Sequence, residues 1–373
     1  MALSPRHQLL AAGTAARPHA GWDGGNSRID ILSLWDDEPE SGRQLEVVAT
    51  IPAPSNRAFH RLAWSASDAS NSAYPYGLLA GALDDGVVYV WDPEEAASER
   101  QSEFNNLLKD DFIEHSLKGF NLESKVNRDD VEDWVVLDKP NRTDNSGLVL
   151  KLNDISGKVF AISFSNNQHK NVLAYGGDSE KLKLYQLDHP IKSYELADVG
   201  SSSRTTFVDW HPQYPVAIAS TCDAATAKIW DLRVKKPTHS INQKNKHCTE
   251  IHWNANHPVE FVVGSVGDDT TVKIWDLRST YRTLSAFGPE KGVVSLSWCR
   301  NPNLIITTAV DGGVDCWKLN VIEGSEPSRT VYLPPERRYL PLGEKQETAW
   351  FDDNVIVASS ALNIGLYKLK SPW

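Results

Sequence analysis

The sequence predicts an all-β fold in which short, similar sheets repeat around a ring, and three observations support this prediction. The phrase "ATAKIWDLR" at 225–233 returns almost unchanged as "TTVKIWDLR" at 270–278. From Tyr185 onward, apolar runs that contain an aromatic residue recur at intervals of 42 to 50 residues. Each such run follows two further short runs of alternating or β-branched residues, which is typical of strands.

Seven aromatic residues mark the third strand of the predicted units: Trp35, Trp91, Tyr185, Trp230, Trp275, Trp317 and Tyr367. In every unit but the first, a strand ending in Trp or Phe comes before the marker, and the connection to the next unit, such as "RTLSAF" at 282–287, supplies a fourth strand. One four-stranded sheet cannot bury both faces, but a ring of sheets buries each face against its neighbours. The repeat length and the WD dipeptide therefore predict a seven-bladed WD-repeat β-propeller formed by residues 1–373 as a single domain.

Aspartates recur at the turn before the third strand. Asp85, Asp269 and Asp311 each lie six residues before their tryptophan. A tight turn at this place lets the carboxylate accept backbone N–H groups, so we assign these residues a structural role.

Two irregularities interrupt the repeat. The first unit shows no strand with an aromatic before "RHQLLAAGT", so either the true start of the chain is missing or blade one is short of a strand and the ring closes poorly. The second irregularity is an insertion at 94–156, after the third strand of blade two, in which Phe104, Leu107, Leu108 and Phe112 have helical spacing. This partly helical insertion either folds onto the side of the propeller, docks a partner through those four residues, or is disordered.

Composition excludes several classes of function. The 38 basic and 49 acidic residues give a net charge of −11, which argues against nucleic-acid binding. The chain has no apolar run long enough to span a membrane and no secretory signal, and its four cysteines form no CxxC pair, so we expect a cytoplasmic protein. It has none of the common catalytic, nucleotide or metal motifs, so we predict no enzyme, no catalytic residue, no cofactor and no metal.

The repeated WDLR phrase leaves other functions open. Arg233 and Arg278 each follow an aspartate in a D-x-R pattern, one blade apart. This pattern resembles the box by which WD-repeat substrate receptors dock on a cullin–RING ubiquitin-ligase adaptor, because an exposed arginine suits a carboxylate or carbonyl on a partner. In a purely structural role, each arginine would cap its own strand end and pair with a neighbouring blade. A third possibility is a peptide- or histone-binding propeller, which "GSVGDDTTVKIWDLR" at 264–278 resembles locally.

Longer stretches resemble one family more specifically. These are "LLAAGTAA" at 9–16, "GLLAGALDDGVVYVWDPEEA" at 77–96, "ASTCDAATAKIWDLRVKKPTHSI" at 219–241 and "KGVVSLSWCRNPNLIITTAVDGGVDCW" at 291–317. They are similar to the N-terminal propeller of the Sec thirty-one family, the large scaffold subunit of the COPII outer coat. The resemblance covers nearly the whole chain.

The resemblance implies a non-catalytic scaffold that helps to assemble the cage for vesicle export from the endoplasmic reticulum. Its implied partners are neighbouring propellers at the cage vertices and a Sec thirteen-like propeller, which the family binds through sequence that would lie beyond residue 373. The chain would then lie at endoplasmic reticulum exit sites and on COPII vesicles, attached peripherally through the coat. The family's solenoid and proline-rich region would also lie beyond residue 373, so the GTPase-stimulating role is not expected of these residues.

Overall fold

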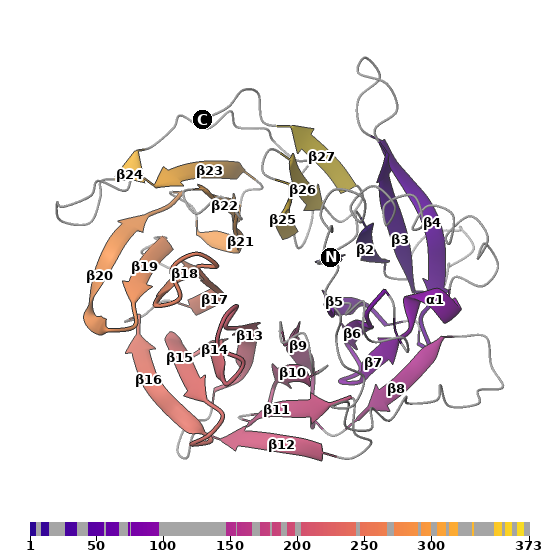
Figure 1. Ribbon diagram of the computed structural model, residues 1–373, viewed down its shortest axis with the longest axis horizontal. Helices are drawn as coiled ribbons and strands as arrows, with labels where there is room; N and C mark the ends of the chain where they lie inside the picture. The colour runs from indigo at the N-terminus through magenta and orange to yellow at the C-terminus, as the bar shows by residue number, and fades with distance from the viewer. Residues whose placement is uncertain are drawn as a thin grey trace, which may run out of the picture.

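The computed structural model of the chain is a ring of antiparallel sheets (Figure 1). The structure describes residues 1–4, 9–14, 27–35, 44–55, 57–66, 74, 76–96, 147–153, 155–165, 172–179, 181–187, 192–197, 203–243, 247–266, 272–289, 292–299, 304–310, 313–319, 330–331, 347–352, 355–359 and 364–368. All structural statements below refer to these residues.

Six sheets have four strands each, in the order of the chain, and we number them as blades 1 to 6. Blades 1 to 3 consist of β1 (Ala2–Leu3), β2 (Leu9–Thr14), β3 (Arg28–Trp35) and β4 (Gln44–Pro52); β5 (Phe59–Trp64), β6 (Leu79–Leu83), β7 (Val88–Trp91) and β8 (Leu148–Leu152); and β9 (Val159–Phe164), β10 (Val172–Gly177), β11 (Lys181–Gln186) and β12 (Lys192–Ala197). Blades 4 to 6 consist of β13 (Thr205–Trp210), β14 (Ala217–Cys222), β15 (Thr226–Asp231) and β16 (Lys236–Asn242); β17 (His247–Trp253), β18 (Glu260–Val266), β19 (Val272–Asp276) and β20 (Ser279–Phe287); and β21 (Val293–Trp298), β22 (Leu304–Ala309), β23 (Val314–Leu319) and β24 (Thr330–Val331). The remaining sheet, the C-terminal sheet, has the three strands β25 (Glu347–Asp352), β26 (Val355–Ser359) and β27 (Ile364–Lys368).

The all-β propeller is confirmed, but the prediction of seven blades with an incomplete first blade is wrong. The described residues form six complete blades, and blade 1 is one of them. Its inner strand is only Ala2–Leu3, which pairs with Leu10 and Ala11 of β2 and is too short to show any alternation in the sequence. The incomplete sheet lies at the other end of the chain, where three strands are described.

The ring closes where the C-terminal sheet packs on blade 1. Val357 of β26 is fully buried in one cluster with Leu10, Ala12 and Leu32 of blade 1. In Figure 1 the chain therefore returns to its starting point, with β25, β26 and β27 beside β2 and β3. Burial of these apolar side chains, at about 25 cal/mol per Å², drives the closure.

The cores lie between adjacent blades, as the small and branched residues of the second strands predict. All five residues of β6 are buried, and Leu78, Ala80 and Val90 share a cluster with Val159 and Leu173 of blade 3. At some positions the neighbouring blades are so close that even a Cβ atom would not fit between them. Gly86, in the turn before β7, has a φ of +80°, and a Cβ there would lie 2.1 Å from the carbonyl oxygen of Gly157.

The predicted insertion contains a strand that the sequence did not reveal. β8 lies within 94–156 and pairs with β7 as the fourth strand of blade 2, with Val90 opposite Leu150. A short helix, α1 (Pro93–Ala96), follows β7. Residues 97–146, including Phe104, Leu107, Leu108 and Phe112, lie outside the described residues, so the helical prediction stays a prediction.

Candidate interaction sites

The two WDLR turns have the same geometry in adjacent blades. In blade 4, Asp231 Oδ1 accepts hydrogen bonds from the backbone N–H and Nε of Arg233 at 2.9 and 3.0 Å, and Oδ2 accepts one from Nη2 at 2.6 Å. In blade 5, Asp276 holds Arg278 through the same three contacts at 2.8, 3.1 and 2.7 Å. Both arginine side chains are 74% exposed.

Each arginine therefore pairs with its own strand end, and none of these contacts reaches a neighbouring blade. The hydrogen bonds from Arg233 lower the pKa of Asp231, and those from Arg278 lower the pKa of Asp276. Both carboxylates stay ionised, so each turn carries a fixed ion pair at the surface.

The loops beside these turns connect blades 4 and 5. His211, which follows β13, lies against Pro258 of blade 5, with Nε2 2.6 Å from the carbonyl oxygen. Its Nδ1 accepts the backbone N–H groups of Gln213 and Tyr214 at 3.0 and 2.9 Å. Because Nδ1 accepts twice, Nε2 carries the proton and the imidazole is neutral. Burial lowers the pKa of His211, which favours the same state.

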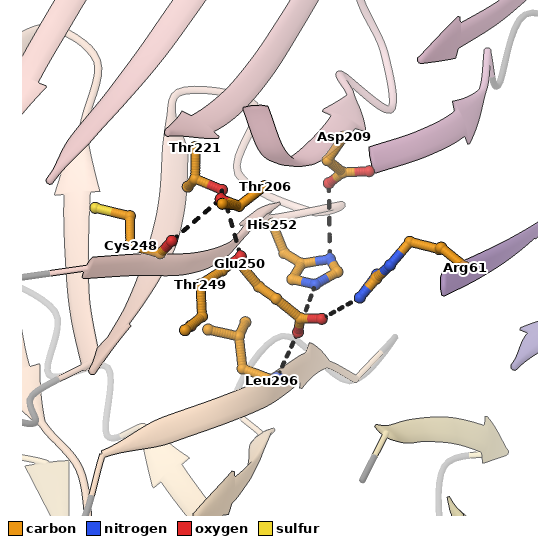
Figure 2. A network of polar contacts seen from close by, with 9 residues as sticks. All are labelled: Arg61, Thr206, Asp209, Thr221, Cys248, Thr249, Glu250, His252 and Leu296. Carbon is orange, nitrogen blue, oxygen red and sulfur yellow. Dashed lines mark hydrogen bonds and ion pairs between the residues drawn. The ribbon is translucent and has the colours of Figure 1, made fainter. Parts of the chain in front are cut away.

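A second candidate site is a polar network near the axis of the ring (Figure 2). Glu250 of β17 is buried and accepts a hydrogen bond from the backbone N–H of Leu296 in blade 6 at 2.6 Å. Its other carboxylate oxygen pairs with Nη2 of Arg61, which comes from β5 in blade 2. Arg61 also lies over the ring of Phe207 in blade 4, 4.2 Å from its centroid. These two side chains link blades that are not neighbours along the ring.

His252 extends this network toward blade 4. Its Nε2 lies 3.7 Å from Glu250 Oε2, and its Nδ1 lies 3.8 Å from Asp209 Oδ2. Asp209 accepts the backbone N–H of Trp253 at 3.1 Å, and burial raises the pKa of this carboxyl group. The hydrogen bonds of Glu250 join three blades, whereas the buried Nε2 of His252 has no hydrogen-bond partner among the described residues and faces its two carboxylates only at ion-pair distance.

The sequence did not predict the axial residues, although a signal exists. Arg61 and Glu250 each lie three residues before the tryptophan that ends the inner strand, and Asp209 and His252 lie one residue before it. Positions two apart share one face of a strand. Charged residues at these positions in otherwise apolar strands were the clue to a polar contact near the axis.

The predicted marker residues lie where the repeat places them. Trp91, Trp230, Trp275 and Trp317 are buried in the third strands, and Tyr185 of β11 packs against the core between blades 2 and 3. Trp35 and Tyr367 lie in β3 and β27. Asp85 Oδ1 accepts the backbone N–H of Val87 at 3.0 Å, whereas Asp269 and Asp311 lie outside the described residues.

The part of the chain that the structure describes contains no group of three or more His, Cys, Asp or Glu side chains that could hold a metal ion. None of its helices has the length and apolar character needed to cross a bilayer.

Comparisons with known proteins agree with the architecture. The profile of the family "WD domain, G-beta repeat" matches residues 235–276, which run from the fourth strand of blade 4 to the third strand of blade 5. "Protein transport protein sec31" of Aspergillus oryzae is 24% identical over 318 residues, or 83% of this chain and 21% of that protein. "Protein transport protein SEC31" of Dictyostelium discoideum is 27% identical over 304 residues, or 79% of this chain and 19% of that protein.

This chain is similar to the SEC31 proteins over most of its propeller. It spans about one fifth of the length of these curated relatives. Among solved structures, a chain of "COPII on membranes, outer coat vertex" has a TM-score of 0.64 at 18% identity and covers 98% of this chain and 82% of that one. A chain of "Crystal Structure of Mitotic Checkpoint Complex" has a TM-score of 0.58 at 14% identity, covering 92% and 87%. At these identities the structural matches show the fold alone.

Proposed function

We propose that this propeller is a non-catalytic scaffold of the COPII outer coat and contributes to the cage that forms during vesicle export from the endoplasmic reticulum. The observation that carries the proposal is the similarity to proteins named for protein transport as SEC31, which extends over 79% to 84% of the chain. None of the proteins reported above is named for a ubiquitin-ligase adaptor or for histone binding.

The geometry supports a scaffold role. Each blade packs against the next, the ring closes through Val357, and Arg61 and Glu250 connect blades 2 and 5 near the axis. A rigid ring presents loops and strand edges at fixed positions, which suits repeated contacts within a cage. Contacts between vertex propellers would be individually small and would gain strength from their number.

Partners and location follow from the same proposal. Neighbouring propellers would contact this chain at the vertices, and a Sec thirteen-like propeller would join through sequence beyond residue 373. The chain would be cytoplasmic and would reach the membrane of endoplasmic reticulum exit sites through the coat.

The test is affinity purification of the endogenously tagged full-length protein, read by mass spectrometry. We expect to recover a Sec thirteen-like propeller together with inner-coat subunits. An untagged strain and a strain that carries the tag on an unrelated propeller are the controls. Recovery of a cullin–RING adaptor instead, lost in Arg233→Ala with Arg278→Ala, would contradict the proposal.

A further inference from the structure

We propose that the Arg233 and Arg278 turns form a two-point binding surface for an acidic segment of a partner protein. The two turns are equivalent in adjacent blades and hold their arginines in the same way. This inference concerns a contact that a coat scaffold could make, but it does not depend on the coat assignment.

The free side of each guanidinium is the basis of the proposal. In both turns the aspartate binds the edge formed by Nε and Nη2. The other edge, formed by Nη1 and the second N–H of Nη2, points away from that carboxylate and belongs to a side chain that is 74% exposed. Two parallel N–H donors on one edge match the two oxygens of a carboxylate. The aspartate thus fixes the arginine in place and leaves the edge formed by Nη1 and Nη2 for a partner. We call this pair of donors the fork of each arginine.

The two forks are connected by a short, hydrogen-bonded path through the protein. The backbone N–H of Leu232 donates to Val216 O at 2.9 Å, and that of Leu277 donates to Val259 O at 2.7 Å. His211 contacts Pro258 O at 2.6 Å, which joins the loop of blade 4 to the loop of blade 5. Each turn is therefore tied to the loop beside it, and the two loops are tied to each other. A fixed separation between the forks lowers the entropic cost of binding both at once.

The surroundings of the first fork are basic and partly apolar, whereas the acidic side chain of Glu260 acts on Arg278 in the second. Lys235 and Lys236 follow the first fork, and Lys235 Nζ lies 5.5 Å from the centre of the Tyr194 ring in blade 3. Val234 is 58% exposed beside Arg233, and Tyr281 is 99% exposed three residues after Arg278. In a chain with a net charge of −11, the lysines beside Arg233 and the two exposed guanidinium groups favour an acidic partner.

Capping of the strand ends does not by itself account for these arginines. The aspartate already accepts the backbone N–H of the residue two positions on, at 2.9 Å in blade 4 and 2.8 Å in blade 5. That contact closes the turn whatever side chain the residue carries. An ion pair at a well-solvated surface adds little to stability, so the extended arginine is better explained by a contact outside the chain.

The experiment uses a defined acidic probe because the natural segment is unidentified. The fluorescein-labelled peptide (Glu-Gly)6 is titrated with the purified protein, and binding is followed by fluorescence anisotropy at low salt. The peptide (Gln-Gly)6 is the probe without charge. We expect (Glu-Gly)6 to bind and (Gln-Gly)6 not to bind. We expect Arg233→Gln with Arg278→Gln to lower the affinity for (Glu-Gly)6 at least tenfold.

Two further variants separate fork geometry from net charge. Arg233→Lys with Arg278→Lys keeps the charge but removes the fork, and we expect it to lose most of the affinity. Lys151→Gln with Lys181→Gln removes the same two charges from blades 2 and 3, and we expect less than a twofold change. Thermal unfolding verifies that every variant is folded. Absence of binding to (Glu-Gly)6, or equal weakening by the control pair, would overturn the proposal.

Discussion

Blades 4 and 5 share a nearly identical phrase, yet they differ in how their buried tryptophans are satisfied. In blade 4, Trp210 Nε1 donates to Ser163 O at 3.1 Å and Trp230 Nε1 donates to Ser220 Oγ at 2.9 Å. In blade 5, the indole N–H groups of Trp253 and Trp275 are buried and have no hydrogen-bond partner among the described residues. The repeat therefore conserves the apolar packing of the two blades but leaves their polar contacts to individual residues.

The register explains the difference at the third strand. Trp230 lies opposite Ile218 and Trp275 lies opposite Phe261, so Ser220 and Val263 occupy equivalent positions two residues on. A serine there accepts the indole N–H and a valine cannot. Blade 6 has the same kind of contact as blade 4, because Trp317 Nε1 donates a hydrogen bond to Thr307 Oγ1 at 2.8 Å.

The inner strands differ as well, and the largest predicted effect lies there. Blade 5 has Glu250 where blade 4 has Phe207, three residues before the tryptophan. We expect Glu250→Ala to lower the free energy of unfolding by about 3–5 kcal/mol, because it removes the buried carboxylate that contacts both Arg61 and the Leu296 N–H. Chemical denaturation measures the change.

The control for Glu250 replaces the pair as a whole. Arg61→Met with Glu250→Leu removes both charges, and we expect it to cost much less than the sum of the two single substitutions. Additive costs would mean that the two side chains do not act as a pair.

The indole contact of blade 4 gives the next largest effect. Ser220→Ala leaves the Trp230 N–H buried without an acceptor, and we expect a loss of about 1–3 kcal/mol in the free energy of unfolding. Thr307→Val makes the same change in blade 6 and should have a similar cost. An unchanged unfolding midpoint for both variants would show that these contacts do not contribute to stability.

The opposite change in blade 5 should be stabilising. Val263→Thr offers the Trp275 N–H an acceptor without changing the side-chain volume much, and we expect a gain of about 0.5–1 kcal/mol by thermal or chemical unfolding. Val262→Thr is the matched control, because Val262 is buried in the neighbouring cluster with Ile274 and Leu296. It should destabilise, and equal effects of the two variants would contradict the role assigned to position 263.

The loop after β13 in blade 4 and the loop after β17 in blade 5 differ in a smaller effect, which is the dependence of stability on pH. Asn254 Oδ1 accepts the N–H groups of Asn256 and His257 at 3.0 and 3.3 Å, as His211 Nδ1 does for the equivalent residues of blade 4. Burial lowers the pKa of His211 below its usual 6.5, so the unfolded chain binds the proton more readily. The contribution of His211 to the free energy of unfolding is therefore complete above pH 6.5. It is lost as the pH falls toward the lowered pKa of the folded protein.

The matched variant copies blade 5 into blade 4. His211→Asn keeps an acceptor in the loop but cannot titrate, so the decline in stability as the pH falls below 6.5 should be less steep than in the wild type. Unfolding curves over this range measure the slope for both proteins. Parallel slopes would show that His211 is not the titrating group.

Strands that carry an aromatic residue at a regular interval could be predicted from the sequence, and strands without one could not. The markers from Trp91 to Trp317 made the blades visible because each combines an aromatic residue with a regular interval. β1 has two residues and no pattern, and β8 has no aromatic and follows residues 97–146, so both were missed. The contact between Arg61 and Glu250 joins positions 189 apart, and no local pattern specifies which inner strands meet near the axis.

The proposed coat function can be tested most directly by cryo-electron tomography of membranes coated with the full-length protein and the purified inner coat. Averaged outer-coat vertices should contain a ring-shaped density that fits this propeller, and omission of the protein should abolish that density. Vertices that form unchanged without the protein, or a membrane coat that excludes it, would contradict the account.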